Sequence, residues 1–175
     1  MKILFLVPDG VGIRNYLYSN LTKELASKGF EIQLYHKISQ AAIKEIENAC
    51  PNIISNTKEL PVLKENFQLR LLRESSAYAR LLNFSKVLNN QSIKYFWGKK
   101  PKTLKLKVFY IFCKFFGRII SLNYAIIRKA EKRYEKLTKS TSAYKKSIQD
   151  LHELKPDYVV NLHQRSPITT PILLA

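Results

Sequence analysis

The fold of this chain is decided by residues 1–35, which read MKILFLVPDGVGIRNYLYSNLTKELASKGFEIQLY. The apolar run Ile3–Val7 predicts a strand buried on both faces, as in a parallel sheet that helices cover. A helical period begins at Arg14, Gly29 is placed to end that helix, and Phe30–Tyr35 predicts a second strand. Strand, glycine-containing turn, helix and strand in this order predict a right-handed βαβ unit.

The rest of the chain adds two further strands and a long helical region. The predicted elements are a helix between Ser39 and Pro51, a strand at Ile53-Ile54, a helix over Phe67–Leu88, a helical stretch over Leu104–Leu137 that is either one helix or two helices broken near Gly117 or Asn123, a helix over Ser147–Leu154 and a strand over Asp157–Leu162. We therefore predict an α/β fold in one domain, residues 1–175, with a Rossmann-like parallel sheet, flanking helices and a long basic amphipathic helical insertion at about 64–150. The last crossover, which starts near Pro171, has no strand to return to, so we expect this domain to be incomplete.

The charge of the chain is large and concentrated in one region. The formal net charge is +17, and sixteen Lys or Arg residues between Lys94 and Lys146 are opposed only by Glu131 and Glu135. A positive field of this size implies an anionic partner, such as lipid head groups, nucleic acid or a phosphorylated substrate.

The cysteines and the amino terminus indicate in which cellular compartment the protein lies. Cys50 and Cys113 are too far apart for a redox pair or a zinc knuckle, and no His lies at ligand spacing from either. We therefore expect free thiols and no metal site. The apolar run after Met1 is too short for a signal peptide and lacks a small-residue cleavage site, so we expect a cytoplasmic protein.

The segment Leu106–Leu137 forms an amphipathic pattern when it is placed on a helix. Cations interrupt its most apolar part, and each cation near a bilayer centre costs about 2.5 to 3.5 kcal/mol, which argues against a membrane span. A helix lying in the interface of an anionic membrane, on its inner face, fits the whole pattern. The alternative is a helix packed on the domain with a solvated basic edge. The candidate membrane contacts are Lys107, Phe112, Lys114, Phe116 and Arg118.

Nucleic acid is the other anionic polymer to consider, because Tyr95, Phe96, Trp97, Tyr110 and Tyr124 interleave with the cations. Apolar residues nevertheless dominate the region, and no helix-turn-helix, zinc-finger or RNP signature accompanies them. The sequence therefore argues against nucleic acid as a partner.

The turns after strands are the expected ligand-binding places, because open α/β sheets bind ligands beyond the carboxyl ends of their strands. In the first turn, Gly10 and Gly12 would allow close ligand approach, and Arg14 and Asn15 open the following helix. The dinucleotide fingerprint is incomplete, because Asn15 stands in its third glycine position and no carboxylate ends the second strand. We therefore expect no nicotinamide cofactor, and the turn alternatively needs small residues only. Asp9 is either a catalytic base or a turn residue.

A second set of polar side chains follows the strand that ends at Leu162. His163 is a candidate general base, Arg165 can hold a phosphate in a bidentate grip, and Ser166 adds a hydroxyl. The alternative for His163 is a structural histidine with satisfied hydrogen bonds. No catalytic triad spacing, zinc-protease motif or Walker lysine is present, so hydrolase and kinase functions lack support.

These residues together resemble the acceptor-side Rossmann domain of the GT-B glycosyltransferases. The match is carried by Lys2–Val7, by Gly10-Val11-Gly12, by Leu25–Ile32, whose Lys-Gly ends the helix, and by Leu154–Val160, which looks like the family's Lys-Pro-Asp entry into a later strand. The resemblance implies transfer of a sugar from a nucleotide-sugar to a glycan or lipid-linked acceptor at the membrane, for a surface polysaccharide or a related glycan. It also implies that Gly10 and Gly12 border the cleft and that His163 is a base or an acceptor contact.

The resemblance implies no cofactor and no obligatory metal, because the nucleotide-sugar is the donor substrate. In that family the donor binds mainly to a second, carboxyl-terminal Rossmann domain, which these 175 residues lack. We therefore do not expect this chain to transfer sugar alone. Two alternatives stay open: half of a nucleotide-sugar epimerase of the same architecture, and a non-catalytic membrane-binding module.

Overall fold

The computed structural model describes residues 1–175 except 11–12, 18, 50, 52, 99–100 and 162–166, and it leaves the side chains of Arg14, Asn15 and Ala49 undescribed. The described chain forms two compact units. We call them the sheet unit, Met1–Leu63 with Thr141–Ala175, and the helical unit, Lys64–Ser140.

The sheet unit is built on four parallel strands in the order β3-β2-β1-β4. The strands are β1 (Lys2–Val7), β2 (Glu31–His36), β3 (Ile54–Glu59) and β4 (Tyr158–Asn161). This order is that of the first half of a Rossmann fold, in which β1 lies between its successor and the strand of a later crossover. The predicted α/β class with a Rossmann-like parallel sheet is therefore confirmed.

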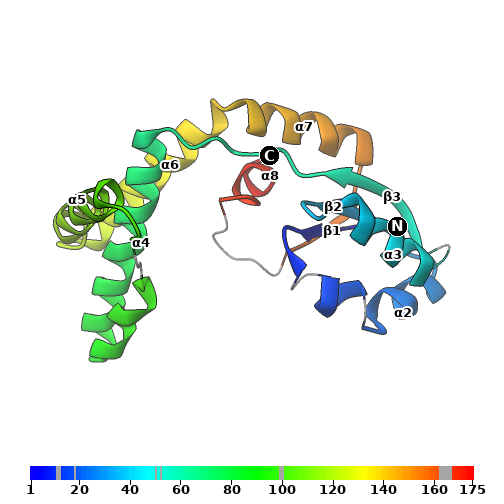
Figure 1. Ribbon diagram of the computed structural model, residues 1–175, viewed down its shortest axis with the longest axis horizontal. Coiled ribbons are helices and arrows are strands. Elements are labelled where there is room, and N and C mark those ends of the chain that lie inside the picture. The colour runs from blue at the N-terminus through cyan, green and yellow to red at the C-terminus, as the bar shows by residue number, and fades with distance from the viewer. Residues whose placement is uncertain (11–12, 18, 50, 52, 99–100, 162–166) are drawn as a thin grey trace. The chain divides into compact units, whose positions relative to one another are not determined.

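Helices cover both faces of this sheet, which explains why β1 and β2 are apolar without alternation. Figure 1 shows α7 (Ser142–Leu154) and α8 (Thr170–Leu174) on one face, and α2 (Leu21–Ser27) and α3 (Gln40–Ala49) on the other. On the first face Leu4, Leu6 and Tyr35 pack against Leu154 and Ile172. On the second face the core residues are Ile3, Phe5, Val7, Ile32, Leu34, Tyr16, Leu17 and Ile46.

Two elements of the sheet unit differ from their predicted extents. The helix expected from Arg14 is divided into a short π-helix, η1 (Ile13–Leu17), and α2. Ser19 lies between them, where its hydroxyl donates to the Tyr16 carbonyl at 3.0 Å and accepts from the Leu21 N–H at 3.3 Å. Such local bonds compete with the helical ladder. Strand β3 extends well beyond Ile53-Ile54, because its polar residues pair with β2 through the backbone at a sheet edge.

The helical unit consists of α4 (Phe67–Val87), the 3-10 helix η2 (Gln91–Trp97), α5 (Leu104–Ile120) and α6 (Tyr124–Lys139). The stretch from Leu104 is thus two helices, and the break lies near Asn123, whose side chain accepts the Ala125 N–H at 2.8 Å. Gly117 lies inside α5, so the other predicted break does not occur. The unit ends at Ser140, and α7, which the sequence analysis included in the insertion, packs on the sheet.

Candidate functional site

The carboxyl ends of β1 and β4 lie side by side. Leu6 is paired with Asn161 in the parallel register, so both strands end at the same edge of the sheet. The strand order also reverses between β1 and β4, and open α/β sheets bind ligands at such a switch point. The described ends of the two strands that precede the predicted site residues therefore lie next to each other.

Part of the predicted strand-end site lies within the described residues. Asp9 and Gly10 follow β1 and are exposed at this edge, and the backbone of Arg14 and Asn15 belongs to η1. The remaining candidates lie outside the described residues, namely Gly12, His163, Arg165 and Ser166.

The backbone conformation at position 10 does not require glycine. Its φ does not lie in the left-handed region, and a Cβ built on it meets no atom within 4 Å. This open space would let a ligand approach the backbone at Gly10 closely.

His36 lies one residue beyond the predicted extent of the second strand. It is the last residue of β2, only 3% exposed, and its Nδ1 accepts the Ile38 N–H at 3.4 Å. Burial lowers the pKa of His36 despite the opposing charge of Glu59, so the imidazole is neutral near pH 7. His36 therefore belongs to the core of the sheet unit, while Lys37 after it is exposed.

A polar network centred on the buried Asp150 ties α7 to the sheet, and no pattern in the sequence indicated its partners. The Tyr35 hydroxyl donates to Asp150 at 2.6 Å, and Lys58 and Lys146 bind the other Asp150 oxygen at 2.9 and 3.0 Å. Burial by itself raises the pKa of Asp150, but the hydrogen bonds from Lys58, Tyr35 and Lys146 outweigh it and the pKa lies below its ordinary value. Asp150 is 1% exposed, so this network holds the fold together and is not open to a ligand.

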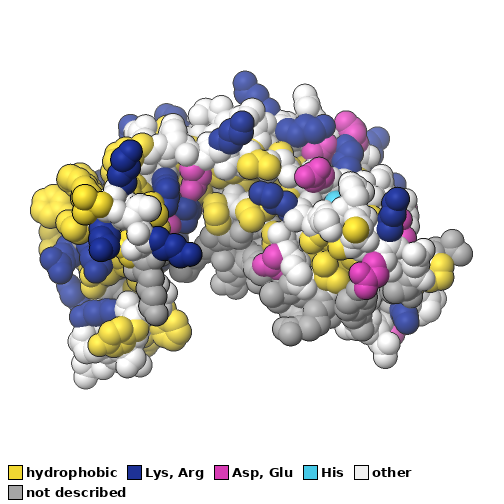
Figure 2. Space-filling model, viewed as in Figure 1, with side chains coloured by type: hydrophobic (Ala, Val, Ile, Leu, Met, Phe, Trp, Pro, Cys, Tyr) yellow, Lys and Arg dark blue, Asp and Glu magenta, His cyan; other side chains and the backbone are white. Residues whose placement is uncertain are grey.

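Helix α5 divides into a buried stripe and an exposed apolar stripe. Phe109, Cys113 and Gly117 pack against α4. The opposite face exposes large apolar side chains: Leu104 76%, Val108 45%, Ile111 65%, Phe112 51%, Phe115 57%, Phe116 40%, Ile119 44% and, just after the helix, Leu122 76%. Figure 2 shows the hydrophobic patch over α5 with Lys and Arg side chains beside it.

The five predicted membrane contacts all lie on the exposed side of α5. Phe112 and Phe116 belong to the apolar stripe, and Lys107, Lys114 and Arg118 are exposed along one edge of it. Further apolar members of this stripe, such as Ile111 and Phe115, were not among the predicted contacts. They could have been found by asking which side of the helix faces α4.

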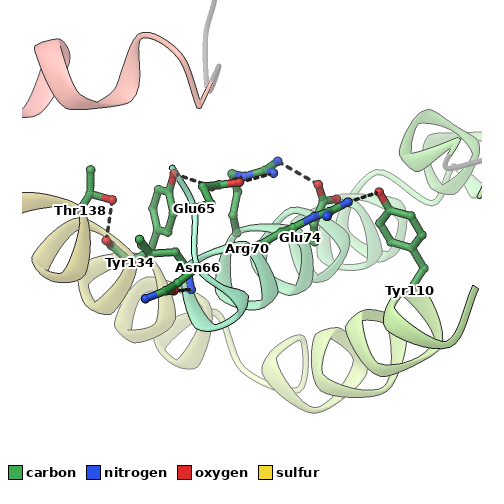
Figure 3. A network of polar contacts seen from close by, with 9 residues as sticks. Glu65, Asn66, Arg70, Glu74, Tyr110, Tyr134 and Thr138 are labelled. Carbon is green, nitrogen blue, oxygen red and sulfur yellow. Dashed lines mark hydrogen bonds and ion pairs between the residues drawn. The ribbon is translucent and has the colours of Figure 1, made fainter. Parts of the chain in front are cut away.

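The acidic residues of the helical unit are largely used inside it. Figure 3 shows Glu65 and Glu74 turned toward the guanidinium groups of α4, and Arg73 bonds Glu65 at 2.7 and 2.8 Å and Glu74 at 2.8 Å. The Tyr134 hydroxyl of α6 donates to Glu65 at 3.3 Å. Glu131 pairs with Arg80, so three of the unit's four carboxylates are internal ion-pair partners.

The described residues offer neither a reactive thiol nor a metal site. Cys113 is fully buried, and burial together with the charge of Glu74 raises the pKa of its thiol to about 11. Among the described residues, no group of three or more His, Cys, Asp or Glu side chains is placed to hold a metal ion.

Comparison of the chain with protein-family models, with curated proteins and with solved structures finds no match. Within the described part of the chain, none of the helices combines the length and the apolar character that crossing a bilayer requires.

The arrangement on α5 suits an interface between water and hydrocarbon. Half-exposed Phe, Ile and Leu side chains can each gain on the order of 1 kcal/mol by leaving water, and cations near an anionic surface add about 1 kcal/mol each. Contiguous exposed apolar surface of this kind marks a binding surface for protein or membrane.

Proposed function

We propose that this chain is the acceptor-binding, membrane-apposed domain of a GT-B glycosyltransferase. In this proposal the sheet unit binds a glycan or lipid-linked acceptor that receives a sugar from a nucleotide-sugar. The exposed apolar stripe of α5, with its row of cations, docks the domain on an anionic membrane surface. The observation that carries the proposal is that stripe, because an amphipathic helix with an unburied apolar face needs a partner.

Charge favours a membrane over a second copy of the chain as that partner. The helical unit contains nineteen Lys or Arg and four Glu residues, and three of the four Glu residues are in internal ion pairs. Two such units would repel each other, whereas an anionic bilayer would attract each of them.

Charge reversal of the three cations beside the stripe tests whether the domain docks on a membrane. The variant Lys107→Glu, Lys114→Glu, Arg118→Glu is compared with the wild type by co-sedimentation with vesicles of phosphatidylcholine and phosphatidylserine. Loss of about 1 kcal/mol for each cation predicts binding at least about 100-fold weaker. All three residues are exposed, and the packing contact that the variant removes, between Lys114 and the Trp97 ring, is worth only about 0.5 to 1 kcal/mol, so the fold should be retained.

A matched control separates the effect of where the charges are reversed from the effect of the change in net charge. Reversal of Lys23, Lys28 and Lys44 changes the total charge equally, but these exposed residues belong to the sheet unit. We expect the control to bind vesicles within a few-fold of the wild type. Equal losses in both variants would mean a diffuse charge effect, and unchanged binding in the α5 variant would remove the membrane clause.

The sugar-transfer clause is supported by the strand order, by the glycine turn after β1 and by the open space at Gly10. The test compares vesicles that contain a lipid-linked saccharide with vesicles of equal charge that lack it. Asp9→Asn and Gly10→Ala should reduce the extra binding that the saccharide confers and leave binding to plain vesicles unchanged. An epimerase would be favoured instead if the saccharide did not increase binding and the protein turned over a nucleotide-sugar in solution.

A further inference from the structure

The 3-10 helix η2 exposes two adjacent aromatic rings at the end of α4. Tyr95 is 83% and Phe96 82% exposed, which makes them the most exposed large hydrophobic side chains among the described residues. Val87 and Leu88, at the end of α4, are 71% and 64% exposed. Aromatic rings of this kind are costly to leave in water, so the tip formed by Tyr95 and Phe96 needs an explanation of its own.

Trp97 fixes this tip against the cationic edge of α5. Its ring lies 4.9 Å from the ring of Tyr78 on α4 and 5.5 Å from the ring of Tyr110 on α5. The Lys114 ammonium lies 5.7 Å from the centre of the same indole ring. The tip is therefore held beside the row of cations that borders the α5 stripe.

The stretch of sequence that carries the tip and the stripe has only cationic charged residues. No Asp or Glu occurs between Glu74 and Glu131, a stretch that contains the end of α4, all of η2 and all of α5. Lys94 immediately precedes the aromatic pair. Figure 2 shows a second hydrophobic patch at the free end of α4, with Lys and Arg side chains between it and the patch over α5.

We propose that Tyr95 and Phe96 form a second insertion point, so that the helical unit binds an anionic bilayer through the aromatic tip and the α5 stripe together. The inference rests on the membrane docking proposed above and adds a separate contact to it. Tyr and Phe side chains would enter the head-group boundary, while Lys94 beside the aromatic pair and Lys107 and Lys114 on α5 meet lipid phosphates.

Two features favour a bilayer over a protein groove or a nucleic acid. Neighbouring residues in a short 3-10 helix lack the i, i+3, i+4, i+7 spacing of a helix that binds in a groove. Single-stranded nucleic acid would stack on the two rings, but it would leave the aliphatic side chains of the α5 stripe, such as Ile111 and Ile119, in water.

The test uses the double variant Tyr95→Ser, Phe96→Ser and vesicles of phosphatidylcholine and phosphatidylserine in equal parts. We expect binding about 10- to 100-fold weaker than that of the wild type. The ratio should persist at high salt, because the loss is apolar and salt does not screen it. A control with Val62→Ser and Tyr158→Ser removes two half-exposed apolar side chains from the sheet unit and should bind normally.

A second readout reports insertion directly. Phe96→Trp in a Trp97→Phe background leaves one tryptophan at the tip, because Trp97 is the single tryptophan of the chain. Lipids brominated in their acyl chains should quench its fluorescence, and unbrominated lipids should shift its emission to the blue.

The outcomes separate this inference from the proposed function. If the α5 charge variant loses binding while the Tyr95 and Phe96 variant does not, and no quenching occurs, the second insertion point is wrong and α5 docking stands. If neither variant loses binding, both proposals fail. Single-stranded RNA binding that the tip variant abolishes, with vesicle binding unchanged, would also overturn the inference.

Discussion

Substitution of Gly117 tests how closely α4 and α5 cross, and so whether α5 must present its other face outward. A Cβ at this position would lie 2.8 Å from the Tyr78 Cδ1 and 2.9 Å from the Ser75 carbonyl oxygen. The Tyr78 ring can rotate slightly, but the Ser75 oxygen belongs to the backbone of α4. The Gly117→Ala variant must therefore push the two helices apart.

Two opposing contributions determine how much Gly117→Ala changes the free energy of unfolding. Replacing glycine by alanine in a helix stabilises it by about 1 kcal/mol, whereas overpacking a close contact costs about 1 to 3 kcal/mol. We expect a net loss of about 1 kcal/mol for Gly117→Ala, which lowers the Tm of a unit of this size by about 4 to 8 °C. Gly117→Leu adds a larger side chain to the same contact and should cost about 3 kcal/mol or more.

The assay is urea unfolding followed by tryptophan fluorescence. Trp97 is the only tryptophan and packs on Tyr78 and Tyr110, so its emission reports the helical unit rather than the sheet unit. Arg118→Ala, at the exposed neighbouring position of the same helix, should change the free energy of unfolding by less than about 0.5 kcal/mol. If Gly117→Ala raises stability by about 1 kcal/mol, helix propensity acts unopposed and the close crossing is wrong.

Three further predictions concern the sheet unit. Asp150→Asn should lower stability by about 2 kcal/mol in unfolding followed by circular dichroism, because it removes the buried carboxylate charge that pairs with Lys58 and Lys146. Tyr35→Phe should cost about 1 kcal/mol, and equal small effects would contradict the network. The pKa of His36 in the folded state lies below its ordinary value of 6.5, so the unfolded state binds the proton first as the pH falls. Stability should therefore fall as the pH drops below 6.5, and His36→Gln should flatten that part of the pH profile. Gly10→Ala should leave the unfolding free energy within about 0.5 kcal/mol of the wild type while it weakens saccharide-dependent binding, and a large loss of stability would show that the turn itself requires glycine.

Local periodicity predicted most of the architecture. The apolar runs of β1 and β2 and the helical period of α4 depend on residues close in sequence, and their observed extents agree with the predicted ones to within a few residues. The prediction of a continuous helix after Arg14 was wrong, because Ser19 forms bonds with the backbone that the apolar period does not reveal. The extent of β3 was missed because an edge strand need not be apolar.

The candidate sites were predictable only where they depend on one element. The cations and Phe residues of α5 could be assigned to its exposed side from a 3.6-residue period. The partner of the Tyr35 hydroxyl could not be assigned, because Asp150 is 115 positions away and any acid on a covering helix would have fitted the pattern. The same holds for Glu65, which lies before α4, so the helical period does not indicate its bond to Arg73.

The placement of the acidic residues links the fold of the helical unit to its proposed role. Glu65, Glu74 and Glu131 form ion pairs among the helices, and the stretch that carries η2 and α5 contains no acid at all. The groups that hold the unit together are therefore separate from the groups that would meet a membrane. Substitutions of exposed cations or aromatic rings should change vesicle binding without changing unfolding, and substitutions of the internal pairs should do the reverse. A variant set that changed both properties in proportion would contradict this separation.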